Sequence, residues 1–126
     1  MPTAVRIRIG KLTFEAQFND SDSARAVIGR MPLSVVMSRW GEKYYGNIGE
    51  DLGQGSADDA RAVMAVGEMA YWPEGNAVSI FFGPTPASTG EAPVAASPVN
   101  PIGKVAGDLS PLKPLGKKVT VELELA

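Results

Sequence analysis

The sequence predicts a mainly β fold, a closed antiparallel barrel of about eight strands with one or two short helices. Apolar and polar residues alternate along several segments, as strands with one buried face require, for example at Val5, Ile7, Ile9, Val119, Val121 and Leu123. Turn residues separate these segments, and no repeated strand-helix-strand pattern is present. A closed sheet is the simplest arrangement because closure removes exposed strand edges.

The first third of the chain reads as a β-hairpin followed by a helix. Residues 5–9 and 12–18 alternate with a period of two, and Gly10 with Lys11 supplies the turn. Asn19, Asp20 and Ser21 can cap a helix over the following residues, which Pro32 ends.

Further strands are expected at 33–40, 44–48, 69–72, 77–82 and 119–125. The segment 56–66 suggests one or two helical turns, and the spacing of Leu109, Leu112 and Leu115 suggests another short turn. Residues 84–101 contain five of the ten prolines and are expected to form a long loop.

Pairing of the first and last strands is predicted by their charges. Arg6 and Arg8 project from the face opposite the apolar residues of the first strand, and Glu122 and Glu124 do the same in the last strand. Antiparallel neighbours would place these opposite charges across from each other.

Composition excludes several kinds of chemistry. The 126 residues fit one domain, residues 1–126, and they contain neither cysteine nor histidine. Zinc sites, disulfides, thiol nucleophiles and Ser-His-Asp triads are therefore excluded, and no cofactor or metal is expected. The net charge is -2 without a basic run, which disfavours nucleic acid. No apolar stretch approaches about 18 residues, so we expect no membrane association and a cytoplasmic location.

Four short motifs carry a family resemblance. They are WGE at 40–42 followed by two aromatic residues at 44–45, GEMAYWPEG at 67–75, FFGPTPAS at 81–88 and VNPIGK at 99–104. In this order and spacing, the chain resembles the cyclophilin-like family of small uncharacterised bacterial and archaeal proteins. The resemblance implies a cyclophilin-like β-barrel.

The cyclophilin prolyl isomerases are a more distant match. By that resemblance, Phe82 is similar to the phenylalanine of their proline pocket, and Arg39 occupies roughly the place of the arginine that donates to the prolyl nitrogen. Ile80 is apolar where the isomerases have a polar residue, the sequence around Arg39 differs, and Val99 stands near the place of their histidine. We therefore expect peptidyl-prolyl cis-trans isomerase activity to be absent, and we favour Arg39 as an exposed residue at a strand end over a role in catalysis.

The predicted function is non-covalent binding of a small molecule or an extended, proline-containing peptide. An aromatic groove beside loop 84–101 would combine rings with hydroxyl and amide groups. Its candidate residues are Trp40, Tyr45, Tyr71, Phe82, Thr85, Ser88 and Asn100. Turn capping and core packing explain the same residues structurally. The alternatives are a prolyl isomerase and an enzyme of another class that uses Glu42 or Glu68.

Overall fold

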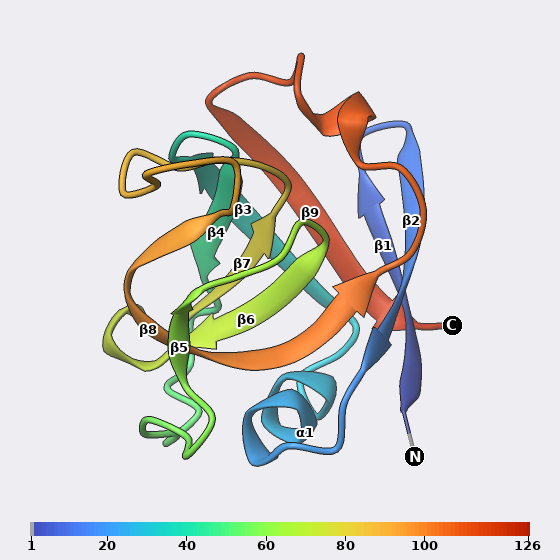
Figure 1. Cartoon of the computed structure of the whole chain (residues 1–126). Coiled ribbons are helices and arrows are strands. Elements are labelled where there is room, and N and C mark those ends of the chain that lie inside the picture. Colours follow the sequence, from blue (N-terminus) through green and yellow to red (C-terminus); the bar gives the residue numbers. More distant parts are fainter. Residues whose placement is uncertain (1) are drawn as a thin grey trace.

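The computed structural model describes residues 2–126, which form one nine-stranded antiparallel sheet that closes into a ring (Figure 1). The strand order is β2-β1-β9-β3-β4-β7-β6-β8-β5, and pairing of β2 with β8 completes the ring. The closed antiparallel sheet predicted from the sequence is confirmed. The bounds are β1 Thr3–Ile9, β2 Leu12–Phe18, α1 Asp22–Ile28, β3 Leu33–Arg39, β4 Lys43–Asn47, β5 Arg61–Val63, β6 Glu68–Trp72, η1 Pro73–Gly75, β7 Ala77–Phe81, β8 Val94–Val105, η2 Ser110–Leu112 and β9 Lys118–Leu125.

The first and last strands are antiparallel neighbours, as their charges predicted. Arg6 lies opposite Glu124 and Arg8 opposite Glu122 in the β1–β9 register. The guanidinium groups of Arg6 and Arg8 lie 3.7 and 3.2 Å from Glu124 Oε1. These exposed pairs contribute about 0.2–1 kcal/mol each, so they favour the register without dominating the stability.

Helix α1 covers one end of the ring (Figure 1). Ser21 Oγ accepts a hydrogen bond from the Ala24 amide at 3.2 Å and caps the helix, as expected for a serine at this position. Ala24 and Val27 are fully buried and belong to the core inside the ring. The helix is only two turns long, so its position depends on this packing rather than on its own stability.

The helical turns expected in 56–66 are absent, and this prediction was wrong. Residues 58–59 form a turn, and Arg61–Val63 form the short strand β5 beside β8. Alanine, valine and methionine at helical spacing also fit an exposed edge strand, and a three-residue strand is too short to show a period of two.

The prediction of a long loop at 84–101 is also wrong for its second half, from residue 94 onward. Strand β8 begins at Val94 and continues through Pro98 and Pro101 to Val105. The pairing of β8 shifts register at two of its three partners, between Arg61 and Val63 of β5 and between Met69 and Ala70 of β6. Prolines are tolerated at such irregularities because the missing amide is not needed there. The connection between β7 and β8 is therefore restricted to residues 82–93.

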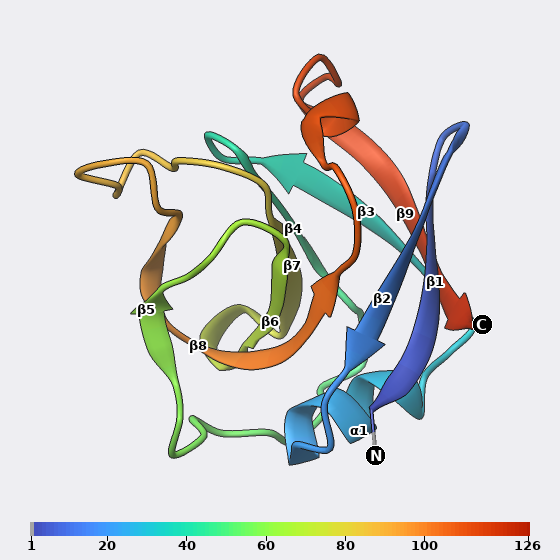
Figure 2. The same ribbon diagram turned by 45° about the vertical axis from the view of Figure 1, so that its right-hand side comes forward.

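Phe81 and Phe82 pack on opposite sides of the sheet. Phe82 belongs to the core inside the ring, whereas Phe81 lies in a second apolar cluster with Met64, Ala95 and Val99. Both rings are almost fully buried. The first half of β8, paired with β5, thus covers the outer face of the sheet beside β6 and β7, as Figure 2 shows from the side.

Candidate functional site

A cavity of about 430 Å³ lies at the end of the ring opposite α1. Three connections meet there: the β5–β6 turn, the loop after β7 and the linker that contains η2 (Figures 1 and 2). We call it the Phe82 cavity, and it is lined by Val66, Phe82, Gly83, Pro84, Glu91, Asp108, Leu109, Ser110 and Lys113. Buried Phe82 and Leu109 give it an apolar floor, and the charged residues are exposed at its edge.

Phe82 is held in place by its backbone and by its ring. Its amide donates to the Glu42 carbonyl at 2.9 Å, just beyond the last pair of β7 with β4. The Tyr44 ring stacks on it with 5.4 Å between centroids, and the guanidinium carbon of Arg39 lies 5.1 Å from its centroid. The position of Phe82 is therefore determined by β4 and β7, which are rigid parts of the sheet.

Arg39 lies at the end of β3 beside Phe82, and its Nε and Nη1 donors are bound to backbone carbonyls. Nε donates to Gly41 at 2.8 Å, and Nη1 donates to Lys113 and Leu115 at 2.8 and 2.9 Å. The guanidinium thereby fastens the linker between β8 and β9 to the sheet. The Tyr44 hydroxyl makes a similar bond, donating to the Gly116 carbonyl at 2.6 Å.

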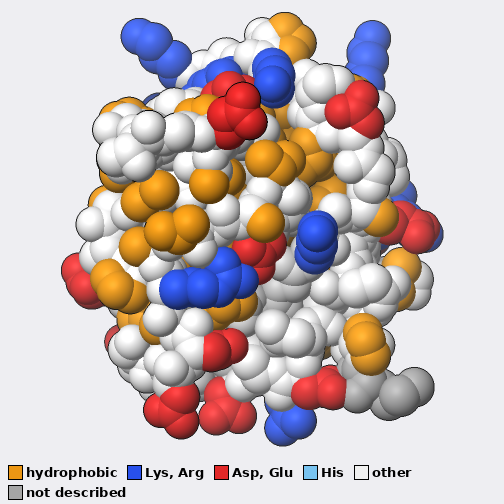
Figure 3. Space-filling view, in the orientation of Figure 1, with side chains coloured by type: hydrophobic (Ala, Val, Ile, Leu, Met, Phe, Trp, Pro, Cys, Tyr) orange, Lys and Arg blue, Asp and Glu red, His pale blue; other side chains and the backbone are white. Residues whose placement is uncertain are grey.

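A second hollow of about 740 Å³ adjoins these residues. We call it the basic groove, and it is lined by Ser38, Arg39, Gly41, Glu42, Lys113, Lys117 and Lys118. Lys113 lines both hollows, and its ammonium lies 3.7 Å from Glu42 Oε2. In the orientation of Figure 1, basic and acidic side chains lie side by side at this end of the molecule (Figure 3).

Thr85 and Ser88 stabilise the loop that borders the Phe82 cavity. Ser88 Oγ accepts from the Thr85 amide and donates to the Ala92 carbonyl, at 2.9 and 2.7 Å. The Thr85 hydroxyl donates to the Val94 carbonyl at the start of β8. These bonds are those of turn caps, and they position Pro84 and Glu91, which line the cavity.

Tyr71 and Asn100 are paired neighbours on β6 and β8, buried and separate from the Phe82 cavity. The Tyr71 hydroxyl donates to Asn76 Oδ1 at 2.6 Å, and burial, with a smaller effect of Asp51, raises its pKa. Asn100 Oδ1 accepts from the Ala57 amide at 2.8 Å, and its Nδ2 donates to Ser23 Oγ and the Gly55 carbonyl, both at 2.9 Å. Asn100 thus connects α1 and the 53–57 loop to the sheet.

Trp40 and Tyr45 surround a buried lysine on the outer face of the sheet. The Lys43 side chain lies under four rings, with Nζ 5.2, 5.1, 5.8 and 5.2 Å from the centroids of Trp40, Tyr45, Trp72 and Phe81. Only 4% of Lys43 is exposed, and burial lowers its pKa to about 8. Lys43 was not predicted as a site residue from the sequence. Its place between WGE and a tyrosine pair was the available signal, since aromatic residues on neighbouring strands can enclose a strand lysine.

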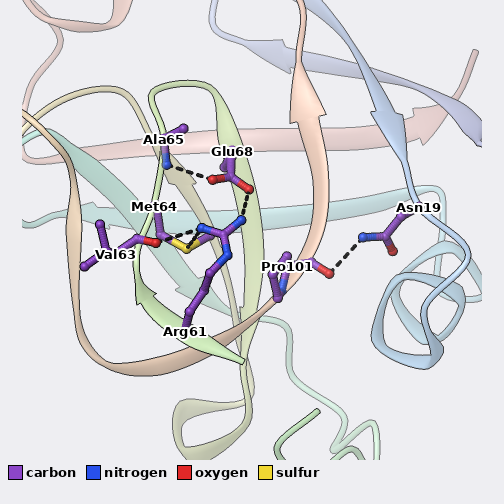
Figure 4. Close-up of polar contacts among 7 residues, drawn as sticks. All are labelled: Asn19, Arg61, Val63, Met64, Ala65, Glu68 and Pro101. Atoms are coloured by element: carbon purple, nitrogen blue, oxygen red, sulfur yellow. Dashed lines mark hydrogen bonds and ion pairs between the residues drawn. The ribbon is translucent and has the colours of Figure 1, made fainter. Parts of the chain in front are cut away.

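Glu42 and Glu68 have different partners. Glu42 lies beside the Lys113 ammonium, as described above. Glu68 accepts hydrogen bonds from Arg61 and from the Ala65 amide in the β5–β6 turn (Figure 4). Partial burial alone would raise its pKa, but the bond from Arg61 and the bond from Ala65 together hold the pKa of Glu68 below its ordinary value. The segment before α1 is joined to β8 by a side-chain hydrogen bond. Asn19 Nδ2 donates to the Pro101 carbonyl at 3.0 Å, as Figure 4 also shows.

The predicted site residues therefore do not gather around one cavity. Of the seven, Phe82 lines the Phe82 cavity, Thr85 and Ser88 fold its bordering loop, and the other four lie elsewhere. The contributions of Val66, Leu109 and Lys113 were missed because they come from turns and a linker that only the closed sheet brings together. Within residues 2–126, no group of three or more carboxylates is placed to hold a metal ion, and no helix is long and apolar enough to span a membrane.

Comparison with known proteins agrees with this architecture. A hypothetical protein from Archaeoglobus fulgidus, whose solution structure is known, superposes with a TM-score of 0.80 at 27% sequence identity, over 99% of this chain and 95% of that chain. A search of curated proteins gives no match. The family model described as cyclophilin-like matches residues 3–124. The chain therefore belongs to the cyclophilin-like family.

Proposed function

We propose that this protein binds a small molecule non-covalently in the Phe82 cavity. The observation that carries the proposal is the cavity itself, about 430 Å³ in volume with buried Phe82 and Leu109 beneath it. Small-molecule sites typically occupy about 300–1,000 Å³ and combine an apolar surface with a few polar groups. Ser110, Lys113 and Glu91 supply such groups at the edge.

The setting of the cavity supports binding by a prepared surface. Phe82 is fixed by Tyr44 and by the hydrogen bond to the Glu42 carbonyl. Its side chain therefore loses little conformational entropy when a ligand covers the ring. Asp108 is also fixed, since its two carboxylate oxygens accept bonds from the amide and hydroxyl of Ser110 at 2.9 and 2.8 Å. The backbone bond, followed by the side-chain bond, lowers the pKa of Asp108, which is therefore ionised at neutral pH.

Prolyl isomerisation is the second candidate because Arg39 lies beside Phe82, 5.1 Å from its centroid. Isomerases of this kind need a guanidinium donor aimed at the substrate nitrogen. Nε and Nη1 of Arg39 are instead bound to the carbonyls of Gly41, Lys113 and Leu115. A proline-containing peptide would have to use Nη2 or displace these bonds, so binding of a small molecule is favoured.

The test uses N-phenyl-1-naphthylamine, an uncharged aromatic probe whose fluorescence rises in apolar sites. Val66 is 52% exposed at the edge of the cavity, so Val66→Trp adds volume there without disturbing the core. The matched control is Val36→Trp on β3, where the valine is 61% exposed and outside the cavity lining. We expect saturable binding to the wild type and to Val36→Trp, with at least tenfold weaker binding to Val66→Trp. Equal binding to both variants, or no binding to the wild type, would refute the proposal.

A further inference from the structure

The basic groove concentrates positive charge in a chain that is slightly acidic overall. Arg39, Lys113, Lys117 and Lys118 line it together with a single carboxylate, Glu42, although the net charge of the chain is -2. A concave surface with one sign of charge raises the local concentration of ligands of the opposite sign. An anionic group would thus be attracted to this groove.

Two of these cations are available for a ligand. Among the described residues, Lys117 and Lys118 have no ion-pair partner, and both are exposed. Lys113 is paired with Glu42 at 3.7 Å, which is beyond hydrogen-bond distance. Arg39 is engaged with backbone carbonyls, so its charge contributes to the field of the groove while its position stays fixed.

The basic groove and the Phe82 cavity adjoin each other. Lys113 lines both, and Arg39 of the groove lies against the ring of Phe82. Gly83 of the cavity contacts Glu42 of the groove so closely that a Cβ there would lie 2.7 Å from Glu42 Cδ. Arg39, Glu42 and Gly83 thus form a packed wall between the two hollows, and a ligand that spans both would pass over Lys113.

We propose that the ligand is an organic anion, with an apolar part over Phe82 and a carboxylate, phosphate or sulfonate between Lys113, Lys117 and Lys118. This inference rests on the proposed function, because it specifies the class of molecule that the Phe82 cavity takes. A cationic ligand is less favoured, since the Asp108 carboxylate at the cavity edge already accepts hydrogen bonds from Ser110. The lysines, by contrast, still have free donors.

Glu42 sets a limit on anion affinity. Its Oε2 is buried and, within the described part of the chain, receives no hydrogen bond, so its charge is only weakly compensated by Lys113. An anion in the groove would be repelled by this carboxylate. Glu42→Gln should therefore strengthen anion binding, a change opposite in sign to the loss expected from removal of the lysines.

The experiment compares two probes with similar aromatic parts. The anion is 8-anilino-1-naphthalenesulfonate, and the uncharged counterpart is N-phenyl-1-naphthylamine, each titrated at low and high salt. We expect the sulfonate to bind at least tenfold more tightly at low salt, with a difference that shrinks as salt screens the lysines. Lys117→Gln and Lys118→Gln should each weaken sulfonate binding about two- to fivefold and leave the uncharged probe unchanged.

The control is Arg25→Gln, which removes one exposed positive charge from α1 at the other end of the ring. It should change the affinity for neither probe, and Glu42→Gln should raise sulfonate affinity alone. Equal affinities for the two probes, with both still lost in Val66→Trp, would overturn the anion inference and keep the proposed function. A sulfonate effect of Arg25→Gln equal to that of Lys118→Gln would also overturn it, since it would indicate general charge attraction. Failure of both probes to bind would overturn both proposals.

Discussion

The ammonium of Lys43 lies 5.1 Å from the centroid of the Tyr45 ring, two positions further along the same strand. Three more rings surround it at 5.2–5.8 Å, and it donates no hydrogen bond to any described residue. Two effects oppose each other here. Burial penalises the charge, whereas the faces of the rings attract it by about 0.5–2 kcal/mol.

We predict that Lys43→Met raises the free energy of unfolding at pH 7. The pKa of Lys43 is lowered from 10.5 to about 8, so the unfolded chain binds the proton more tightly, and folding at neutral pH carries a penalty of up to roughly 3 kcal/mol. The penalty is complete below pH 8 and disappears as pH rises to about 10.5. Urea unfolding of both proteins between pH 7 and 10.5 tests this. A variant that is less stable at pH 7 would show that the rings outweigh burial.

We predict that Asn100→Ala lowers stability and leaves the cavity intact. The side chain makes three hydrogen bonds, to Ala57, Gly55 and Ser23, and its loss leaves buried groups unpaired at a cost of about 1–3 kcal/mol. The affinity for N-phenyl-1-naphthylamine should not change, because Asn100 does not line the Phe82 cavity. Urea unfolding and probe titration on the same variant separate the two roles. Weaker probe binding by a fully folded variant would contradict this prediction and show that Asn100 contributes to ligand binding.

We predict that Gly46→Ala destabilises the sheet. A Cβ at this position would lie 2.4 Å from the Val36 carbonyl oxygen and 2.6 Å from Val35 Cγ1, so β3 and β4 would have to move apart, at a cost of about 1–3 kcal/mol. The control is Gly55→Ala, where a Cβ meets nothing within 4 Å and the backbone is not in the left-handed region. Thermal unfolding should show a clearly lower melting temperature for Gly46→Ala and an unchanged one for Gly55→Ala.

We predict that prolyl isomerase activity stays at the uncatalysed rate. Arg39 uses its Nε and Nη1 donors on backbone carbonyls, and Ile80 is buried and apolar. A protease-coupled assay with a proline peptide measures this. Cis-to-trans conversion well above background, abolished in an Arg39→Ala variant that remains folded, would establish the alternative function.

Period-two patterns and motifs were sufficient to predict most of the fold. β1, β2 and β9 follow from alternation, and their pairing follows from Arg6, Arg8, Glu122 and Glu124. The errors occurred where local sequence is ambiguous. The extent of β8 depends on a register shift that accommodates Pro101 beside Ala70, and this shift is determined by the neighbouring strand rather than by the local sequence.

The candidate site was less predictable than the fold. Phe82 was a candidate through its similarity to the phenylalanine of the isomerase proline pocket, but Val66, Leu109 and Lys113 lie 16, 27 and 31 positions away and approach it only through closure of the sheet. Polar residues in the motifs have two interpretations. Asn100, Thr85 and Ser88 make hydrogen bonds that fold loops, and sequence alone does not separate that role from ligand contact.

The two ends of the ring differ, and this difference has a kinetic consequence. α1 fills one end with Ala24 and Val27, while the loop after β7 and the η2 linker border the cavity at the other. A molecule bound over Phe82 must therefore arrive and depart through the same opening. Those two segments would control its association and dissociation rates together, so a cross-link between them should slow exchange in both directions without altering the surface that recognises the ligand.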